Sequence, residues 1–386
     1  MTDVLFFVGS LAVGGTERHL SQVLPALTKR GWALKMVVFS DGGAFTEPIE
    51  AAGIPIEVLP RGFSVPVPKL RGALALVQQT RALAVGLRRR PPRILHCFLP
   101  TCCIVGGLAV RMAGFSPVVM SRRSQAARPS SFPGDKSMER WALRHANLVF
   151  GHSSRVIDEL KAEGIANTKL RLNHNGIDLE AFDDAAGERE GTRRAEQWRP
   201  DEIVFATVAN LIPYKGHVDL IQAFARLAGN LPWRLVLVGQ GGPAFTQQLR
   251  ELTQRLGIAE RVDFLGGRAD VPRLLKAADA GILASHQEGF PNAILEYMAA
   301  SLPVIATATG GNFDAVCENQ TGLLIPPAAP ELLSQAAVLL LSDPLLRKRL
   351  GQAGRRRVES TFSLDACVDR YEDAYRGLLG NGHHHG

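Results

Sequence analysis

The strongest constraint on the fold is a pattern of short, almost continuously apolar segments that alternate with segments of helical periodicity. The pattern occurs twice, with apolar segments at 4–8, 34–39, 54–59, 93–98, 116–121 and 147–152, and then at 202–209, 234–239, 261–266, 280–285, 303–307 and 322–326. Apolar strands without polar alternation are typical of sheets buried on both faces, and helices between them indicate parallel pairing through right-handed crossovers. The sequence therefore predicts an α/β protein with two doubly wound, Rossmann-like domains.

The length and one charged segment indicate how the two domains are divided. A chain of 386 residues exceeds the roughly 250–300 residues of a single hydrophobic core. Segment 173–202 combines turn residues and dense charge with little apolar periodicity, so we predict domains at 1–180 and 202–361 joined by a linker at 181–201. Ligands of open α/β sheets bind beyond the carboxyl ends of the strands. We therefore expect the chemistry in a central cleft that both domains face.

The cysteines and the apolar segments indicate the compartment. The five cysteines are scattered through apolar runs, with no disulfide framework and no zinc-binding spacing, which suits a reducing cytoplasm. The N-terminal segment has no basic region and no small-residue cleavage site of a signal peptide. The apolar run 99–110 is shorter than the roughly 20 residues that span a bilayer. We expect a soluble, cytoplasmic protein.

The charge is unevenly distributed along the chain. The formal net charge is +7, but segment 61–145 contains 15 Lys and Arg residues and only two acids, so the rest of the chain is net negative. A field this one-sided attracts anionic partners such as nucleic acid, an anionic membrane or a phosphorylated substrate. A solvated basic face without a specific partner remains the alternative.

Glycines follow two of the predicted strands. Gly14 and Gly15 lie between the first strand and a helix, with Thr16 as the expected N-cap, and Gly239 follows the strand at 234–239. Glycines let the backbone approach a ligand closely, and the helix entrance offers free N–H groups to an anion. The first motif is not the Gly-x-Gly-x-x-Gly dinucleotide fingerprint, and each motif is also compatible with an ordinary tight turn.

A polar turn holding Asn210 and Lys215 follows the strand at 202–209 and precedes an amphipathic helix. A lysine at a helix entrance adds a point charge to the helix dipole and is a suitable phosphate partner. The alternative is a solvated lysine at a helix start.

The stretch from His286 to Thr307 contains two glutamates, Glu288 and Glu296, on either side of a helix start. Pro291 suits the first helical position, and the next residues offer free N–H groups to an anion. A metal site is not expected, because no histidine or third acid lies at ligand spacing. The pattern favours a phosphate at the helix start with sugar hydroxyls at both glutamates, as in a nucleotide sugar. Two ordinary surface glutamates remain the alternative.

Taken together, the motifs Glu-Gly-Phe-Pro-Asn-Ala-Ile-Leu-Glu (288–296), "NLIPYKG" (210–216), "GQGG" (239–242) and "GGTER" (14–18) resemble the retaining GT-B glycosyltransferases of family 4, also called glycosyl transferases group 1. The motifs occur in the family's order and cover nearly the whole chain. The resemblance implies transfer of a hexose-type sugar from a nucleotide diphosphate sugar to a hydroxyl group of a glycan or lipid-linked acceptor in cell-surface polysaccharide or glycolipid synthesis. It implies no metal and no cofactor other than the nucleotide sugar as co-substrate.

The resemblance also implies the roles of the domains and of single residues. The N-terminal domain would bind the acceptor, with a C-terminal helix at about 362–380 packed back onto it, and the C-terminal domain would bind the donor. Glu288 would contact sugar hydroxyls, Glu296 the ribose, Lys215 and Gly15 the diphosphate, and the backbone near Arg268 the base. The expected catalytic residues are Glu288, Lys215, Arg123 and His96. The expected donor-binding residues are Gly14, Gly15, Asn210, Lys215, Gly239, Arg268, Glu288, Gly289, Phe290, Pro291, Asn292, Ala293 and Glu296.

The chain departs from the family's usual pattern at two positions. Asn210 stands where the family often has an arginine on the diphosphate. Arg122 or Arg123 stands where the simpler mannosyltransferases often have a histidine, and we hypothesise that Arg123 faces the phosphates or an anionic acceptor. His96 matches a histidine that is frequent at its strand end, although a histidine satisfied within the core is equally compatible with the sequence.

The basic segment of the N-terminal half gains a role from this resemblance. It would hold a membrane-bound, diphosphate-linked acceptor near an anionic leaflet, which predicts peripheral association with the inner face of the membrane. A nucleic-acid partner is not expected, because the chain has only 6% aromatic residues and no RNA-binding signature. The rival functions are a nucleotide-sugar 2-epimerase of the same fold and a non-catalytic nucleotide-sugar-binding protein.

Overall fold

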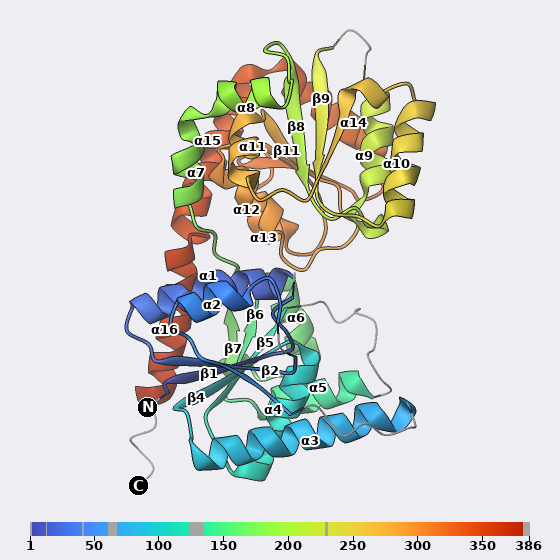
Figure 1. Cartoon of the computed structure of the whole chain (residues 1–386). Coiled ribbons are helices and arrows are strands. Elements are labelled where there is room, and N and C mark those ends of the chain that lie inside the picture. The colour runs from blue at the N-terminus through green and yellow to red at the C-terminus, as the bar shows by residue number, and fades with distance from the viewer. Residues whose placement is uncertain are drawn as a thin grey trace. The chain divides into compact units, whose positions relative to one another are not determined.

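The chain divides into two compact units, of which one joins Met1–Gly176 with Leu364–Gly386 and the other is Ile177–Ser363 (Figure 1). The computed structural model describes residues 2–12, 14–40, 42–60, 68–123, 134–227 and 231–380, with side chains of the 68–89 helix from Leu74 onward. None of the helices in these ranges is long and apolar enough to cross a membrane.

The first unit contains a parallel sheet of seven strands in the order β3-β2-β1-β4-β5-β6-β7. The strands are β1 (Val4–Val8), β2 (Leu34–Val38), β3 (Ile56–Val58), β4 (Ile94–Phe98), β5 (Val118–Arg122), β6 (Leu148–Gly151) and β7 (Leu170–Leu172). Six of them fall on segments predicted from the sequence. The seventh, β7, lies at the edge of the sheet, and only its first residue is buried.

Helices cover both faces of this sheet (Figure 1). The helices are α1 (Gly15–Lys29), α2 (Thr46–Ala51), α3 (Pro68–Arg89), α4 (Pro100–Ala113), α5 (Asp135–His145), α6 (Ser154–Ala162) and α16 (Leu364–Gly380), with a 3₁₀ turn η1 (Asn167–Lys169). Neighbouring residues of β1 enter different cores: Phe6 packs with α1 and α16, whereas Phe7 packs with α3 and α4. Burial on both faces explains why the strand is continuously apolar.

The second unit contains a parallel sheet of six strands in the order β10-β9-β8-β11-β12-β13. The strands are β8 (Ile203–Val208), β9 (Trp233–Val238), β10 (Val262–Gly266), β11 (Ala280–Leu283), β12 (Val304–Thr307) and β13 (Gly322–Ile325). Every strand predicted in this half of the sequence is present. The expectation of two doubly wound α/β units is therefore confirmed.

The helices of the second unit also lie on both faces of its sheet (Figure 1). They are α7 (Glu180–Asp184), α8 (Arg189–Ala195), α9 (His217–Ala225), α10 (Pro243–Arg255), α11 (Val271–Ala277), α12 (Asn292–Ala299), α13 (Asn312–Ala315), α14 (Pro330–Ser342) and α15 (Pro344–Thr361), with 3₁₀ turns η2 (Ala185–Gly187), η3 (Pro213–Lys215) and η4 (Ala259–Arg261). One core contains residues of α11 and α12, and the other contains residues of α9 and α14.

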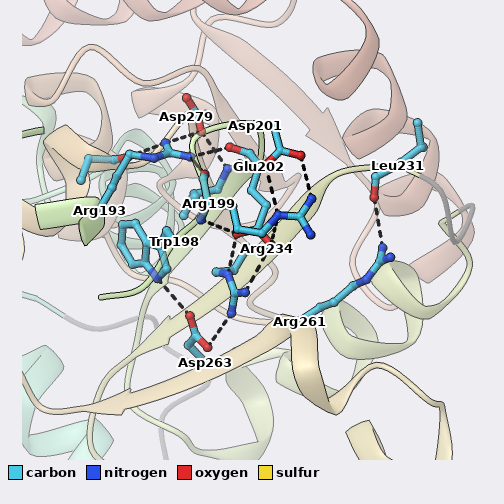
Figure 2. A network of polar contacts seen from close by, with 12 residues as sticks. Arg193, Trp198, Arg199, Asp201, Glu202, Leu231, Arg234, Arg261, Asp263 and Asp279 are labelled. Carbon is cyan, nitrogen blue, oxygen red and sulfur yellow. Dashed lines mark hydrogen bonds and ion pairs between the residues drawn. The ribbon is translucent and has the colours of Figure 1, made fainter. Parts of the chain in front are cut away.

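The segment expected to be a linker, 181–201, is instead folded into the second unit, where it contributes α7 and α8. Phe182 and Trp198 are both 3% exposed and belong to a core cluster. The dense charge that suggested a linker is engaged within the unit: Arg193 donates to the carboxylate of Asp279 at 3.2 Å and to the carbonyl of Glu202 at 2.5 Å (Figure 2). Charge density therefore marked an ion-pair network and not a solvated connection.

The last helix, α16, belongs to the first unit although 187 residues of the second unit precede it in the chain. Its inner face carries Cys367, Tyr371 and Tyr375, which are at most 1% exposed and share a core with β1, β4 and α1. At its start, Arg30 at the end of α1 pairs with Asp365 at 2.6 Å and with Glu372 at 3.0 Å. Apolar packing and ion pairs thus hold α16 against α1.

Candidate active site

Three loops meet at the carboxyl edge of the second sheet, because β8, β11 and β12 are neighbours there. The loop after β8 meets the loop after β11 through a hydrogen bond from the amide of His286 to the carbonyl of Tyr214 at 2.8 Å. The loop after β12 joins the same loop through the amide of Gly311 and the carbonyl of Gly289 at 3.1 Å. This edge is where ligands of parallel sheets bind.

Lys215 and Glu288 form an ion pair within this group of loops. The distance from Lys215 Nζ to Glu288 Oε1 is 2.6 Å, and the side chains are 18% and 9% exposed. A charge-assisted hydrogen bond of this length is among the stronger polar contacts in proteins. The lysine ammonium also lies 5.4 Å from the ring centroid of Tyr214, a cation–π distance. The structure thus brings together two residues that the sequence placed after different strands.

The close approach of Lys215 depends on Gly216. This glycine has φ +71°, in the left-handed region, and a Cβ atom there would lie 2.0 Å from the carbonyl oxygen of Ala284 at the end of β11. No side chain fits at that distance, so glycine allows the turn after β8 to pack against the end of β11. The turn then carries Lys215 to Glu288.

The helix that follows Glu288, α12, starts at Asn292, and its N-cap is Pro291. Pro291 was expected at the first helical position and lies one residue earlier, in extended conformation. The side chain of Phe290 is 8% exposed and packs against Phe362 at 5.7 Å between ring centroids, so this residue offers mainly its backbone to a ligand. Gly289, Asn292 and Ala293 are partly exposed at the same helix start. A helix N-terminus presents backbone N–H groups and the positive end of the helix dipole, which suits an anion.

Glu296 lies one turn inside α12 and is 3% exposed, while Glu288 before the helix is 8% exposed. Two carboxylates with such low exposure are not the ordinary surface glutamates that were the alternative interpretation. The neighbouring Tyr297 anchors α12 to the sheet, because its hydroxyl donates to the carbonyl of Ile282 at 3.1 Å and accepts from the amide of Val208 at 2.8 Å. Burial raises the pKa of Tyr297, which keeps this hydroxyl a donor.

Asn210 and Gly239 lie close together, since they follow the neighbouring strands β8 and β9. A Cβ atom at Gly239 would lie 2.0 Å from the carbonyl oxygen of Ala209 and 3.0 Å from the amide nitrogen of Asn210. The adjoining amide of Leu211 donates to the carbonyl of Gln240 at 2.7 Å. Asn210 itself is exposed. The glycine therefore lets the two loops run side by side at the edge.

Arg268 lies after β10, and its side chain is engaged by acids of its own unit. It pairs with Asp270 at 2.7 Å and with Glu196 at 2.8 Å, and these hydrogen bonds raise the pKa of its guanidinium. The resemblance assigned base binding to the backbone near Arg268. The guanidinium links Glu196 at the end of α8 to Asp270 at the start of α11. Only the backbone of Arg268 therefore stays a candidate for base binding.

In the first unit, the N-terminus of α1 carries the expected glycines. Gly14 is the N-cap and Gly15 is the first helical residue, so Thr16, the expected N-cap, lies inside the helix. The carboxylate of Glu17 folds over this turn: a Cβ atom at Gly14 would lie 2.2 Å from Glu17 Oε2. Burial raises the pKa of Glu17 above its ordinary value, and a backbone hydrogen bond and the charge of Arg123 offset only part of this rise.

The sequence left open whether Arg122 or Arg123 occupies the position of interest after β5, and the structure separates them. Arg122 is 5% exposed and is bound by acids, with Glu163 at 2.6 Å and Glu139 at 3.3 Å. Arg123 donates to the side-chain oxygen of Asn175 and is partly exposed. Arg122 is therefore engaged by acids of its own unit, and Arg123 is the more exposed of the two arginines.

His96 was expected to act in catalysis or to be satisfied within the core. It is fully buried, and its ring nitrogens contact the hydroxyl of Tyr375 at 2.7 Å and that of Ser121 at 2.8 Å. Burial lowers the pKa of His96 well below its ordinary value. A buried, neutral ring with both nitrogens engaged favours the core interpretation, because a substrate cannot reach it.

Two parts of this edge were not predicted from the sequence. The loop after β12 carries Gly310 and Gly311, and a Cβ atom at Gly311 would lie 2.5 Å from the carbonyl oxygen of Gly289. Its signal was present, since the same pattern of a strand followed by glycines marked the other loops. The second is the contact of His286 Nε2 with Asp219 on α9 at 2.6 Å. Residue spacing gave no signal for this contact, because it joins elements 67 residues apart.

Within the described ranges, no group of three or more His, Cys, Asp or Glu side chains is placed to hold a metal ion. The candidate site of the second unit is accordingly made of one ammonium, two carboxylates, a helix N-terminus and glycine-containing loops. Such a set can bind a phosphate and accept hydrogen bonds from hydroxyl groups.

Comparison with known proteins gives two family matches along the chain. Residues 13–181 match the model of "Glycosyltransferase Family 4", and residues 188–357 match that of "Glycosyl transferases group 1". Together with the two parallel α/β units, these matches define a glycosyltransferase fold of the GT-B type. The chain belongs to glycosyltransferase family 4, as the motifs indicated.

Individual relatives are distant in sequence. An N-acetyl-alpha-D-glucosaminyl L-malate synthase of Bacillus anthracis is 28% identical over 64% of this chain, and the match spans only 64% of that relative. A UDP-Gal:alpha-D-GlcNAc-diphosphoundecaprenol alpha-1,3-galactosyltransferase of Escherichia coli is 25% identical, over 82% of this chain and 84% of that protein. Among solved structures, Anabaena Alr3699/HepE in complex with UDP superimposes with a TM-score of 0.85 at 22% identity, covering 98% of this chain and all of HepE.

Proposed function

We propose that this protein transfers a hexose-type sugar from a nucleotide diphosphate sugar to a hydroxyl group of a glycan or lipid-linked acceptor, with retention at the anomeric carbon and without a metal ion. The observation that carries the proposal is the Lys215–Glu288 pair beside the N-terminus of α12. A diphosphate requires positive charge and free N–H groups, and a sugar requires buried hydrogen-bond acceptors. Both sets of groups lie on adjacent loops.

In the proposed reaction, the acceptor hydroxyl oxygen attacks the anomeric carbon as the bond to the diphosphate breaks on the same face. The hydroxyl proton passes to a phosphate oxygen of the leaving diphosphate. Lys215 and the α12 N-terminus stabilise the charge that develops on this leaving group, and Glu288 orients the sugar through its hydroxyls. Arg123, on the first unit, binds an anionic group of the acceptor.

The relatives support the choice of substrates to test first. The HepE structures hold UDP or UDP-glucose, and the name of the Escherichia coli relative includes UDP-galactose and a diphosphoundecaprenol acceptor. We therefore propose a UDP sugar as donor and a lipid-linked diphosphate as acceptor, in polysaccharide or lipopolysaccharide synthesis in the cytoplasm.

A lipid-linked acceptor requires the enzyme to work at a membrane surface, and α3 has a face that suits this. Its exposed stripe combines aliphatic and basic residues at helical spacing, namely Leu74, Val77, Arg81, Val85 and Arg88. The helix contains no acidic residue. We propose that this stripe lies on an anionic leaflet, where each well-placed basic residue contributes about 1 kcal/mol. The basic residues of segments 61–67 and 124–133 lie outside the described residues.

Vesicle sedimentation tests the membrane proposal. Binding should rise with the fraction of anionic lipid and fall with salt, and the double variant R81Q/R88Q should weaken it. The matched control is R171Q, an exposed arginine on the edge strand β7 of the same unit. Absent or salt-insensitive binding would contradict the proposal.

A thermal-shift screen against UDP, GDP, ADP and dTDP and their sugars tests the donor site. At least one nucleotide sugar should raise the unfolding temperature of the wild type, and Glu288→Ala and Lys215→Ala should reduce the shift that this nucleotide sugar causes. If no nucleotide stabilises the wild type, the proposed donor site is wrong. Incubation of the active donor without acceptor separates a transferase from a 2-epimerase, because only an epimerase yields a new nucleotide sugar. Binding without transfer to any acceptor would indicate a non-catalytic protein.

A further inference from the structure

In the proposed reaction, Lys215 and Glu288 have separate partners, yet in the structure they bind each other. The ammonium would hold the diphosphate and the carboxylate would hold sugar hydroxyls, but the two side chains are joined at 2.6 Å and are 18% and 9% exposed. A ligand that draws either side chain away from the other therefore weakens this bond. The free-energy cost of replacing the ion pair by contacts to a ligand therefore differs between ligands.

A free nucleoside diphosphate offers a new partner to Lys215 alone. When the ammonium turns toward the phosphates, the carboxylate of Glu288 loses part of its compensation while it remains buried, and a buried charge without full compensation is unfavourable. The intact nucleotide sugar brings phosphates for Lys215 and hydroxyl donors for Glu288. Both charged groups then exchange one hydrogen-bond partner for another. The intact donor therefore binds without leaving the Glu288 carboxylate uncompensated.

The surrounding structure limits how far the backbone around Glu288 and Lys215 can move to relieve this cost. The loop that carries Glu288 is fixed by the hydrogen bond from Gly311 to Gly289 at 3.1 Å and by the packing of Phe290 on Phe362. The turn that carries Lys215 is fixed at Gly216, where the carbonyl of Ala284 leaves no space for a side chain. Both ends of the ion pair are therefore attached to backbone that has little freedom to relax.

We propose that the Lys215–Glu288 ion pair makes the site discriminate between an intact nucleotide diphosphate sugar and the free nucleoside diphosphate that the reaction releases. The pair weakens retention of the product and favours entry of the next donor molecule. The inference rests on the proposed function, since it requires a nucleotide sugar at this site, and it assigns Glu288 a second role beyond contact with the sugar.

Calorimetric titration of four proteins with two ligands tests the inference. The proteins are the wild type, Glu288→Gln, Lys215→Met and the double variant, and the ligands are UDP and UDP-glucose, or the nucleotide and sugar selected by the thermal-shift screen. Glu288→Gln should bind the free diphosphate about fivefold more tightly than the wild type, because the ammonium is released, and the nucleotide sugar about tenfold more weakly. The gain for the diphosphate should disappear in the Lys215→Met background.

Glu202→Gln is the matched control, because Glu202 is another buried carboxylate of the same unit, paired with Arg234 at 2.9 Å. It lies before β8, at the opposite edge of the sheet from Lys215, and should change neither affinity. If Glu288→Gln does not fold, Glu288→Asp keeps the charge but shortens the reach, and its affinity for the diphosphate should also exceed that of the wild type.

Three results would overturn the inference while the proposed function stands. They are a Glu288→Gln variant that binds the diphosphate no more tightly than the wild type, a gain that persists fully with Lys215→Met, and an equal gain in the Glu202→Gln control. A persistent gain would point to direct repulsion between Glu288 and the phosphates. Failure of the proposed function has a different signature, because the wild type would then bind neither ligand.

Discussion

The two edges of the second sheet both contain paired basic and acidic residues, but the surroundings of these pairs differ. At the amino edge, where β8, β9, β10 and β11 begin, arginines and acids form a dense network (Figure 2). Arg234 alone contacts Glu202 at 2.9 Å and Asp263 at 3.0 Å, and Trp198 donates to the same Asp263 at 3.0 Å. At the carboxyl edge, Lys215 and Glu288 pair beside glycine-containing loops and a helix N-terminus.

The difference shows how to separate structural charge from charge that serves a ligand. At the amino edge, Arg193 is held by the carboxylate of Asp279 and by backbone carbonyls, and Arg234 is held by two carboxylates, so an added ligand would have to displace several bonds. At the carboxyl edge, close backbone approach is made possible by glycines at positions such as Gly216 and Gly239. Perturbing the first edge should therefore cost stability, and perturbing the second should cost binding and catalysis.

The largest effect is expected at the amino edge, from Arg193→Met. The guanidinium of Arg193 is bound by Asp279 and by the carbonyls of Ala277 and Glu202, and the residue is 7% exposed. Removing one member of a buried network should lower the free energy of unfolding by about 3–5 kcal/mol. Chemical denaturation measures this loss, and nucleotide affinity of the folded protein should not change.

Arg189→Met is the matched control, because Arg189 pairs with the same Asp279 at 2.5 Å but its side chain is 43% exposed. It should lower the free energy of unfolding by less than about 1 kcal/mol. Equal losses for both variants would contradict the interpretation of the amino edge as a buried structural network.

Lys215→Met at the carboxyl edge is expected to affect catalysis more than stability. Loss of the ammonium should lower kcat/KM about 10²–10³-fold, because it removes charge stabilisation of the leaving diphosphate. The free energy of unfolding should fall by about 1–3 kcal/mol, less than with Arg193→Met, because the buried Glu288 carboxylate loses its partner. Steady-state kinetics with a nucleotide sugar and denaturation of the same sample measure both quantities. A variant that loses stability but keeps its activity would erase the distinction between the two edges.

His217, the first residue of α9, should make stability depend on pH. It is fully buried, and burial together with the nearby charge of Lys215 lowers its pKa to about 4. Between this value and the ordinary value near 6.5, the unfolded chain binds a proton that the folded protein does not. Stability should therefore fall as pH falls from about 6.5 to 4, by up to about 3 kcal/mol.

His217→Gln should remove this part of the pH dependence. Denaturation of wild type and variant at several pH values measures the difference between their slopes. An unchanged slope would show that His217 is not buried in its neutral form. Such an unchanged slope would also argue against a rigid turn between Lys215 and the start of α9.

The smallest effect is expected from Tyr375→Phe in the first unit. Its hydroxyl contacts His96 Nδ1 at 2.7 Å, and both residues are fully buried. Loss of this hydrogen bond should lower the free energy of unfolding by about 1 kcal/mol and leave kcat unchanged. A large fall in kcat with an altered pH profile would instead assign His96 to catalysis.

Much of the fold could be predicted, because strands buried on both faces leave a direct signal in the sequence. Phe6 and Phe7 face different cores, so consecutive positions of β1 must both be apolar. The edge strand β7 was not predicted, because only Leu170 of its three residues is buried. The predicted linker was wrong, since composition cannot distinguish a solvated charge from one paired with a partner far along the chain.

The candidate site could be predicted as separate motifs but not as an arrangement. Lys215 and Glu288 are 73 residues apart, and they meet because β11 is inserted beside β8 in the sheet order. Likewise, Arg122 at the end of β5 is bound by Glu139 and Glu163, whereas its neighbour Arg123 contacts Asn175 instead. The order of the strands in the sheet and the contacts between residues far apart in the sequence arise only in the folded chain, so the sequence motifs alone do not reveal them.

The position of α16 has a consequence for how the protein is made. The ribosome releases the chain from its N-terminus, so residues 177–363 can complete the second unit while the first still lacks its last helix. Until α16 emerges, the sheet face that Tyr371 and Tyr375 later cover remains open. Domains usually fold in the order of synthesis. Here the unit that is begun first is finished last, and part of its apolar core can be covered only when the last helix has been synthesised.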